Sequence, residues 1–293
     1  MAIPEDRLKV WANQGATEGS KNTYTSIKAA LDGYSWPEGM KPDIYLQGSY
    51  ANSTNTRGNS DVDVVAEMTC VYYSNLTEAE KPRVGWIPGR YSFSDFRVHV
   101  VTALRSYYGA ALVDDAGGKA VRVSAAAGRL NADVLPCVQY KRYDALQVVA
   151  EGVTFWNQVN GEQVVNYPRL HIKNGEQKNE TERSKGGYKL SLRMFKNARS
   201  NIVGESEVLR KRYPSYFVEC LLFNVPDHAY LSSYQYTYVT AVEFVSNALS
   251  SGAASKFVTQ SWQHWLFGST SVQWSQDHAK DLVVRLEQLW KNG

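Results

Sequence analysis

The sequence predicts an α+β protein of two lobes, a mixed sheet with helices followed by a helical bundle. Two observations support this fold class. Stretches with alternating apolar and polar residues, which are typical of strands, are mixed with helical segments before Pro168, whereas the long segments after it have helical periodicity. Turn signals such as Asn160-Gly161 separate the strands. We therefore expect a first lobe at residues 1–168 and a helical lobe at residues 169–293, with the site in the cleft between them.

Composition limits the class of protein. The chain has 293 residues, of which 43% are hydrophobic, and a net charge of only +3. This charge is too small to indicate duplex nucleic acid as a required partner. No apolar run approaches the ~18–20 residues of a membrane span, and the first residues lack the pattern of a signal peptide. Three widely spaced cysteines argue against disulfides and a zinc site. We expect a cytoplasmic protein that needs no membrane.

The expected elements follow from periodicity and turn residues in chain order. The first is helical, with a break at Gly15, and a turn-rich connector follows it. A later helix is expected to begin at Ser94, which is a suitable N-cap. A surface loop is expected at residues 69–91. The expected helices are 4–30, 94–108, 169–201, 213–224, 234–250 and 275–291, and the expected strands lie at 44–47, 61–65, 119–124, 131–138 and within 143–165.

Gly48 and Ser49 follow directly after the first expected strand. Glycine lets the backbone turn tightly and approach a ligand closely. Ser49 adds a hydroxyl and backbone N–H groups at the start of a short helix expected to run to Thr56, which is typical of a phosphate-binding site. A Gly-Ser pair alone, however, is an ordinary turn in most proteins.

Asp61 and Asp63 lie two residues apart on the next expected strand, so their side chains share a face while Val62 and Val64 point to the core. Two neighbouring carboxylates repel each other unless a cation lies between them. Hard oxygen ligands suit Mg²⁺. The alternative is an exposed sheet edge, but the combination with Gly48-Ser49 favours nucleotidyl transfer.

Asp133 stands among apolar residues in a later strand, where aspartate is uncommon. It either caps a turn or serves as a third metal ligand that also accepts the proton of an attacking ribose hydroxyl. Residues 173–199 hold eight Lys or Arg and three Glu. A helix there places Lys189, Arg193 and Lys196 on one face, which is either a solvated face or a binding site for a polyphosphate.

These motifs resemble the DNA polymerase β-like nucleotidyltransferase superfamily, and the resemblance covers about residues 8–225. Two segments, Leu192–Lys196 and Pro214–Leu222, are similar to the helical lobe of cyclic GMP-AMP synthase, oligoadenylate synthase and the bacterial CD-NTases. His171, Asn174-Gly175 and Lys178-Asn179 resemble the bacterial members.

The resemblance implies a role for each matching residue. The metal triad, with two Mg²⁺ ions or Mn²⁺ in their place, corresponds to Asp61, Asp63 and Asp133. Gly48 and Ser49 correspond to the loop that holds the phosphates. The expected contacts from the helical lobe are Lys196 and Ser215 to the triphosphate, Tyr216 to a stacked base, Asn174 in the base pocket, and Lys189 on the basic face.

The implied activity is synthesis of a cyclic di- or trinucleotide second messenger from nucleoside triphosphates, with ATP as donor and release of pyrophosphate, in bacterial anti-phage signalling. An effector would read the product, and a HORMA-type or ubiquitin-conjugating-like partner would bind the C-terminus. The zinc insertion of the animal DNA sensor has no counterpart here. The alternatives are nucleotidyl transfer to an RNA, a protein or a small molecule, and a silent nucleotide-binding module.

Overall fold

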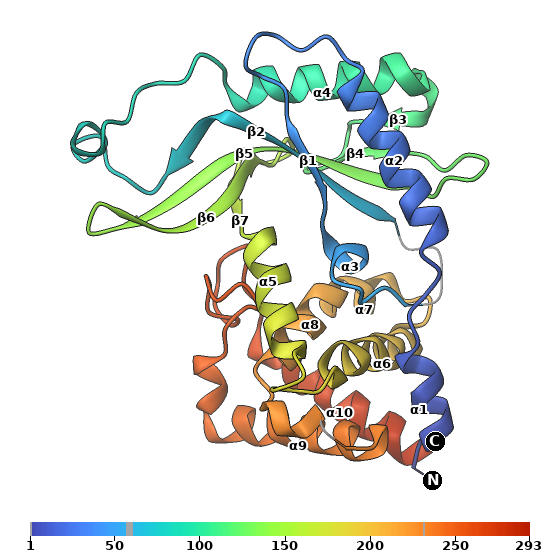
Figure 1. Cartoon of the computed structure of the whole chain (residues 1–293). Helices are drawn as coiled ribbons and strands as arrows, with labels where there is room; N and C mark the ends of the chain where they lie inside the picture. The colour runs from blue at the N-terminus through green and yellow to red at the C-terminus, as the bar shows by residue number, and fades with distance from the viewer. Residues whose placement is uncertain (1, 57–60, 231) are drawn as a thin grey trace. The chain divides into compact units, whose positions relative to one another are not determined.

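The computed structural model describes residues 2–56, 61–230 and 232–293 (Figure 1). The chain divides into two compact units. The helical unit comprises the described residues of Met1–Gly15, Asn52–Gly58 and Leu170–Gly293, and the sheet unit those of Ala16–Ala51 and Asn59–Arg169. This division differs from the expected lobes in two segments, because the N-terminal residues and those that follow Ala51 pack with the helices.

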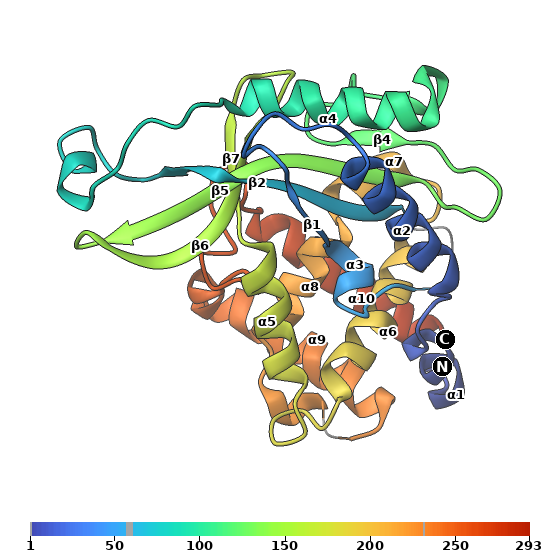
Figure 2. The same ribbon diagram turned by 45° about the horizontal axis from the view of Figure 1, so that its top comes forward.

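A mixed sheet forms the centre of the sheet unit, and its described strands run in the order β1-β2-β5-β4-β3, with β6 paired to β5 and β7 to β6. Only β2 and β5 are parallel among these pairs. β5 and β6 form a long hairpin that projects from the sheet (Figure 2). The strand bounds are β1 Asp43–Leu46, β2 Val62–Ser74, β3 Val113–Asp114, β4 Val121–Val123, β5 Ala132–Asp144, β6 Gln147–Trp156 and β7 Gln163–Asn166.

β2 is much longer than the expected strand at residues 61–65. Its first half is apolar and buried, as is typical of a central strand. Its second half, Val71–Ser74, is rich in residues that favour strands and pairs with β5 as far as Lys141. The expected surface loop at residues 69–91 is therefore wrong in its first part.

Two helices of the sheet unit, α2 (Glu18–Asp32) and α4 (Phe93–Tyr108), pack against each other and against the sheet. The N-cap of α4 is Ser92 and not Ser94 as expected. Ser92 Oγ accepts a hydrogen bond from the backbone N–H of Asp95, whose carboxylate accepts one from the backbone N–H of Ser92. This capping box satisfies two free donors at once, which explains why the helix begins earlier.

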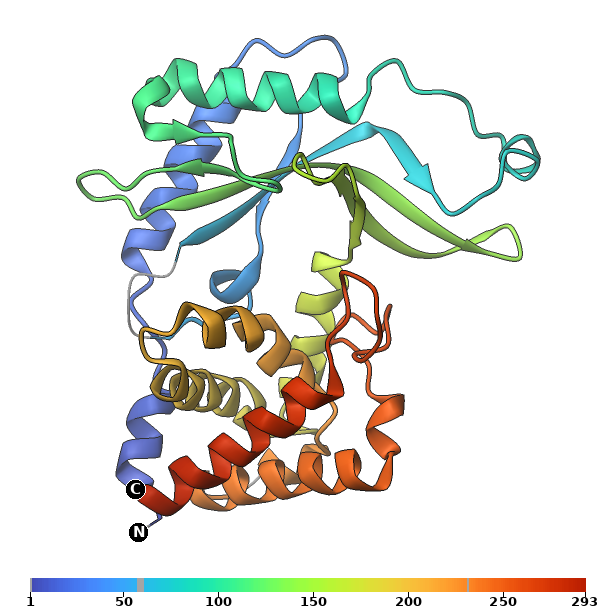
Figure 3. The same ribbon diagram turned by 180° about the vertical axis from the view of Figure 1, so that it is seen from behind.

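The helical unit has its own core, to which helices from both ends of the chain contribute. α9 and α10 lie side by side (Figure 3), and Tyr238 stacks on Trp290 between them. The helix expected at residues 169–201 is divided in two by the turn at Gly186, whose φ is +80°. The helix bounds are α1 Glu5–Ala12, α5 Pro168–Asn179, α6 Gly187–Val203, α7 Glu207–Arg212, α8 Ser215–Phe223, α9 Tyr234–Ser251 and α10 Gln276–Asn292.

All three cysteines are free. In the parts of the chain that the structure describes, no helix combines the length and the apolar character needed to cross a membrane.

Candidate active site

Asp63 on β2 and Asp133 on β5 are direct partners in the register of this parallel strand pair, so they lie side by side. Side chains of partnered residues project from the same face of a sheet. The flanking residues Val62, Val64 and Val134 are fully buried on the opposite face. The sheet therefore brings together two carboxylates that are far apart in the sequence, as predicted.

Asp61 lies just before β2, and its charge is close enough to Asp133 to affect the pKa of that residue. Arg122 on β4 is the antiparallel partner of Asp133, and a guanidinium nitrogen of Arg122 is 3.6 Å from Asp61 Oδ2. Burial and then the nearby charge of Asp61 raise the pKa of Asp133, whereas Arg122 lowers it. Arg122 was not predicted from the sequence, because only the strand order places it beside these aspartates.

The carboxylate oxygens of Asp61, Asp63 and Asp133 are ligands that suit a hard divalent cation. The three carboxylates are nevertheless not arranged around a common metal position in this structure. Within the described residues, no three His, Cys, Asp or Glu side chains are close enough together to hold a metal ion as they stand. The carboxylate of Asp61 is turned toward Arg122 instead.

The Gly48-Ser49 turn lies against Asp63. The backbone N–H of Gln47 donates to the carbonyl of Asp63 over 3.0 Å. Gly48 has a φ of +66°, and a Cβ atom at this position would lie 2.2 Å from Asp63 Oδ2. Any other residue at this position would therefore require the Asp63 carboxylate or the turn to shift, and would adopt a backbone conformation that favours glycine. α3, the helix that begins here, ends at Ala51 and not at Thr56 as expected.

The residues predicted in the helical unit differ in their accessibility. Ser215 is the exposed first residue of α8. Tyr216 is 44% exposed, and its ring stacks on that of His171 at a centroid distance of 5.0 Å. The amide of Asn174 donates to the carbonyl of Gln260 over 2.8 Å, and burial lowers the pKa of Lys189. Their roles as substrate contacts stay predictions.

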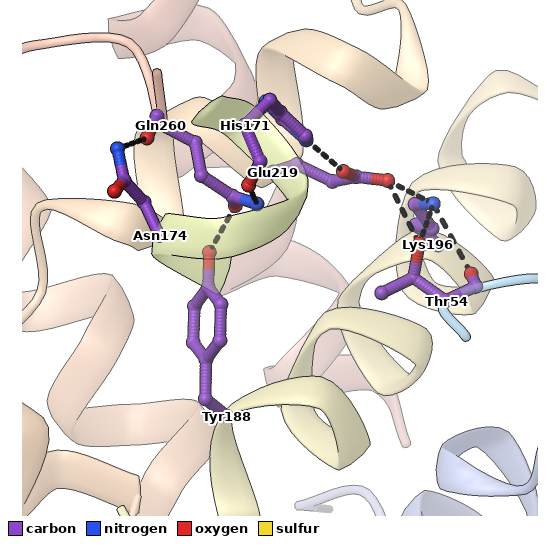
Figure 4. Close-up of polar contacts among 7 residues, drawn as sticks. All are labelled: Thr54, His171, Asn174, Tyr188, Lys196, Glu219 and Gln260. Carbon is purple, nitrogen blue, oxygen red and sulfur yellow. Dashed lines mark hydrogen bonds and ion pairs between the residues drawn. The ribbon is translucent and has the colours of Figure 1, made fainter. Parts of the chain in front are cut away.

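Lys196 is buried, with 5% of its surface exposed, in a polar network of the helical unit (Figure 4). Its ammonium donates to the carbonyl and hydroxyl oxygens of Thr54 over 3.1 and 2.9 Å, and forms an ion pair with Glu219. The other carboxylate oxygen of Glu219 lies 3.2 Å from His171 Nε2. A solvated face is therefore excluded for Lys196, and its predicted contact with a triphosphate stays a prediction.

The basic segment at residues 173–199 is largely tied to partners inside the helical unit. Arg193 donates to the carbonyls of Ala12 and Ser53, each over 2.6 Å. Lys178 and Arg183 both pair with Asp227. The local excess of positive charge, which indicated a polyphosphate site, thus serves in large part to hold the helical unit together.

Glu219 is expected to make the stability of the protein depend on pH below about pH 5. Burial acts to raise its pKa, but Lys196 and His171 together lower it to about 2, from a usual value of 4.5. A carboxyl with this pKa contributes on the order of 3 kcal/mol above its unfolded pKa. This contribution is lost as the pH falls from about 4.5 toward about 2.

The measurement is urea unfolding of the wild type and of Glu219→Gln at about pH 6 and about pH 3. We expect the wild type to be more stable at the higher pH. The difference in the free energy of unfolding between the two proteins should shrink at the lower pH. A difference that stays constant would contradict the assigned charge of Glu219.

Together, the mixed sheet, the partnered aspartates and the Gly-Ser turn define a nucleotidyltransferase. Residues 173–291 match the family model described as the cGAS/DncV-like nucleotidyltransferase C-terminal helical domain. The chain is 42% identical to the cyclic UMP-AMP synthase of Rhodothermus marinus (strain SG0.5JP17-172), over 99% of this chain and 98% of that one. It is 31% identical to the cyclic nucleotide synthase CdnE01 of Staphylococcus haemolyticus, over 99% of each.

Solved structures agree with this similarity. The structure of Rhodothermus marinus CdnE c-UMP-AMP synthase with Apcpp and Upnpp is similar at a TM-score of 0.91 and 41% identity, covering 99% of this chain and 97% of that one. The chain therefore belongs to the bacterial CD-NTase family of cyclic nucleotide synthases. The predicted family and fold class are confirmed.

A HORMA-type partner occurs in a solved complex of Escherichia coli CdnC, which is only 13% identical, with a TM-score of 0.56, and covers 98% of this chain and 84% of that one. Such a likeness indicates a shared fold alone. The HORMA-type or ubiquitin-conjugating-like partner stays a prediction.

Proposed function

We propose that this enzyme joins two nucleoside triphosphates into a cyclic dinucleotide at Asp61, Asp63 and Asp133, with release of pyrophosphate. The observation that carries the proposal is the register of β2 and β5, which sets Asp63 beside Asp133. The Gly48-Ser49 turn lies against the same carboxylate, which supports its proposed role in holding phosphate.

The chain's own residues divide the reaction between them. Ser49 and the turn at Gly48 hold the phosphates of the donor, and Asp133 accepts the proton of the acceptor's ribose hydroxyl. The hydroxyl oxygen forms a bond to the α-phosphorus while the bond to the β-phosphate breaks, and a second, equivalent transfer closes the ring.

Two Mg²⁺ ions, or Mn²⁺ in their place, would be held by Asp61, Asp63 and Asp133. When bound, such ions neutralise phosphate charge and acidify a hydroxyl. Asp61 joins this set when its carboxylate turns away from Arg122, which lies 3.6 Å from it in the structure.

The proposed substrates are ATP and UTP. The cyclic UMP-AMP synthase of Rhodothermus marinus is 42% identical over nearly the whole chain, and its CdnE structure was solved with Apcpp and Upnpp. We propose that the product is a cytoplasmic second messenger that an effector reads in anti-phage defence.

The test is to incubate the purified enzyme with Mg²⁺ and each nucleoside triphosphate, alone and in pairs, without any other acceptor. We expect ATP with UTP to yield pyrophosphate and a phosphatase-resistant dinucleotide that contains one adenine and one uracil. Product analysis by mass spectrometry distinguishes the alternatives. Product that forms only after addition of RNA, protein or a small molecule would favour transfer to that acceptor, and binding without pyrophosphate release would favour a silent module.

A further inference from the structure

A short segment that follows the phosphate-binding turn, Ser53–Asn55, is held by the helical unit through most of its polar atoms. We call it the anchor segment. The carbonyl of Ser53 accepts from Arg193, and both oxygens of Thr54 accept from Lys196. The carbonyl of Asn55 accepts from the backbone N–H of Gly15, and its side-chain amide donates to the carbonyl of Gly15. The anchor segment therefore has a fixed position within this unit.

The centre of this arrangement is a buried ion pair. Thr54 is 1% exposed, Lys196 is 5% exposed and Glu219 is 4% exposed. The hydroxyl of Thr54 donates to Glu219 over 3.1 Å and accepts from Lys196, so it connects the two charged groups (Figure 4). A buried charge requires such complete pairing, because it has lost its water. The ammonium of Lys196 is already used by these partners.

The anchor segment is tied to the phosphate-binding turn by the chain itself. α3 begins at Gly48, and only Asn52 separates its last residue, Ala51, from Ser53. On the other side, the turn lies against Asp63, since a Cβ atom at Gly48 would lie 2.2 Å from Asp63 Oδ2. A shift of the anchor segment would therefore be passed on to the turn over a few residues.

We propose that Lys196, Arg193 and Glu219 are positioning residues, which fix the anchor segment and through it the phosphate-binding turn. Lys196 acts through Thr54 and does not bind the triphosphate as a point charge. This inference rests on the proposed function, since it assumes that the turn at Gly48 and Ser49 holds phosphate.

Glu219→Gln separates the two roles of Lys196 by the sign of its effect. If Lys196 were a phosphate ligand, removal of its buried counter-charge would leave binding of a triphosphate unchanged or tighter. If Lys196 positions the anchor segment, loss of the ion pair loosens that segment and weakens binding. The probe is Apcpp with Mg²⁺, titrated by calorimetry, and we expect binding about tenfold weaker than in the wild type.

Thr54→Val gives a second test that leaves the ion pair in place, with Thr54→Ser as its matched control. We expect the valine variant to bind Apcpp several-fold more weakly and to raise KM more than it lowers kcat, and the serine variant to behave as wild type. We also expect faster backbone hydrogen exchange over residues 48–55 in Thr54→Val. A structural role without a link to the turn would change neither the exchange at Gly48–Ala51 nor KM.

The inference is overturned if Glu219→Gln binds Apcpp as tightly as the wild type or more tightly, or if Thr54→Val binds like Thr54→Ser. Hydrogen exchange needs no catalysis, so it reports on the anchor segment even if no cyclic product forms. A wild type that neither binds Apcpp nor releases pyrophosphate would instead contradict the proposed function.

Discussion

Asp63→Asn is expected to lower the rate of pyrophosphate release about a thousandfold or more, with little change in the free energy of unfolding. The register of β2 and β5 places Asp63 beside Asp133, so one neutral side chain removes half of the paired negative charge. Loss of about 4 kcal/mol of transition-state stabilisation corresponds to this factor. The fold should tolerate the change, because removal of one of two like charges relieves repulsion.

Asp144→Asn is the matched control, since Asp144 is the exposed last residue of β5, at the opposite end of the strand from Asp133. The same chemical change there should leave turnover close to that of the wild type. Pyrophosphate release and urea unfolding are measured for both variants. A folded Asp63→Asn enzyme that turns over as fast as Asp144→Asn would show that Asp63 is not part of the catalytic group.

Gly48→Ala is expected to lower turnover about a hundredfold or more. The added Cβ would lie 2.2 Å from Asp63 Oδ2, so either the carboxylate or the turn must move. A displacement of about 1 Å at reacting groups is enough for a loss of this size. The positive φ of +66° also disfavours alanine, at a cost of about 1–2 kcal/mol.

Gly161→Ala separates the clash from the backbone strain. Gly161 lies in the turn between β6 and β7 with a φ of +70°, and a Cβ there would meet nothing within 4 Å. Both alanine variants should therefore lose the stability that the positive φ costs, while only Gly48→Ala should lose activity. Equal turnover in the two variants, measured by product formation under saturating triphosphates, would mean that the space beside Asp63 is not needed.

The parts of the sheet that depend on local patterns were predicted well from the sequence. A strand was predicted from Asp61 to Val65, and β2 begins at Val62. The turn signal at Asn160-Gly161 was confirmed between β6 and β7. The parallel pairing of β2 with β5 could not be predicted, because strand order depends on contacts between distant segments. For the same reason the sequence did not indicate Arg122 as the cation beside the aspartates.

The charge pattern of the sequence predicted the structure less well than its hydrophobic periodicity did. The excess of Lys and Arg at residues 173–199 indicated a surface for phosphate, but the structure buries Lys196 and Arg193 among carbonyl and carboxylate partners. A signal was present, since Glu219 stands in an otherwise apolar helix. A lone acid in such a segment predicts a buried basic partner. The assignment of the N-terminal helix α1 to the helical unit had no comparable signal.

We propose that Asp61, Asp63 and Asp133 act together on the same cations. The most direct measurement is the number of Mn²⁺ ions bound per chain, by equilibrium dialysis, in the presence of Apcpp and Upnpp. We predict two ions for the wild type, as in two-metal sites, and one for Asp133→Asn. The same number of bound ions in both proteins would contradict a shared carboxylate site.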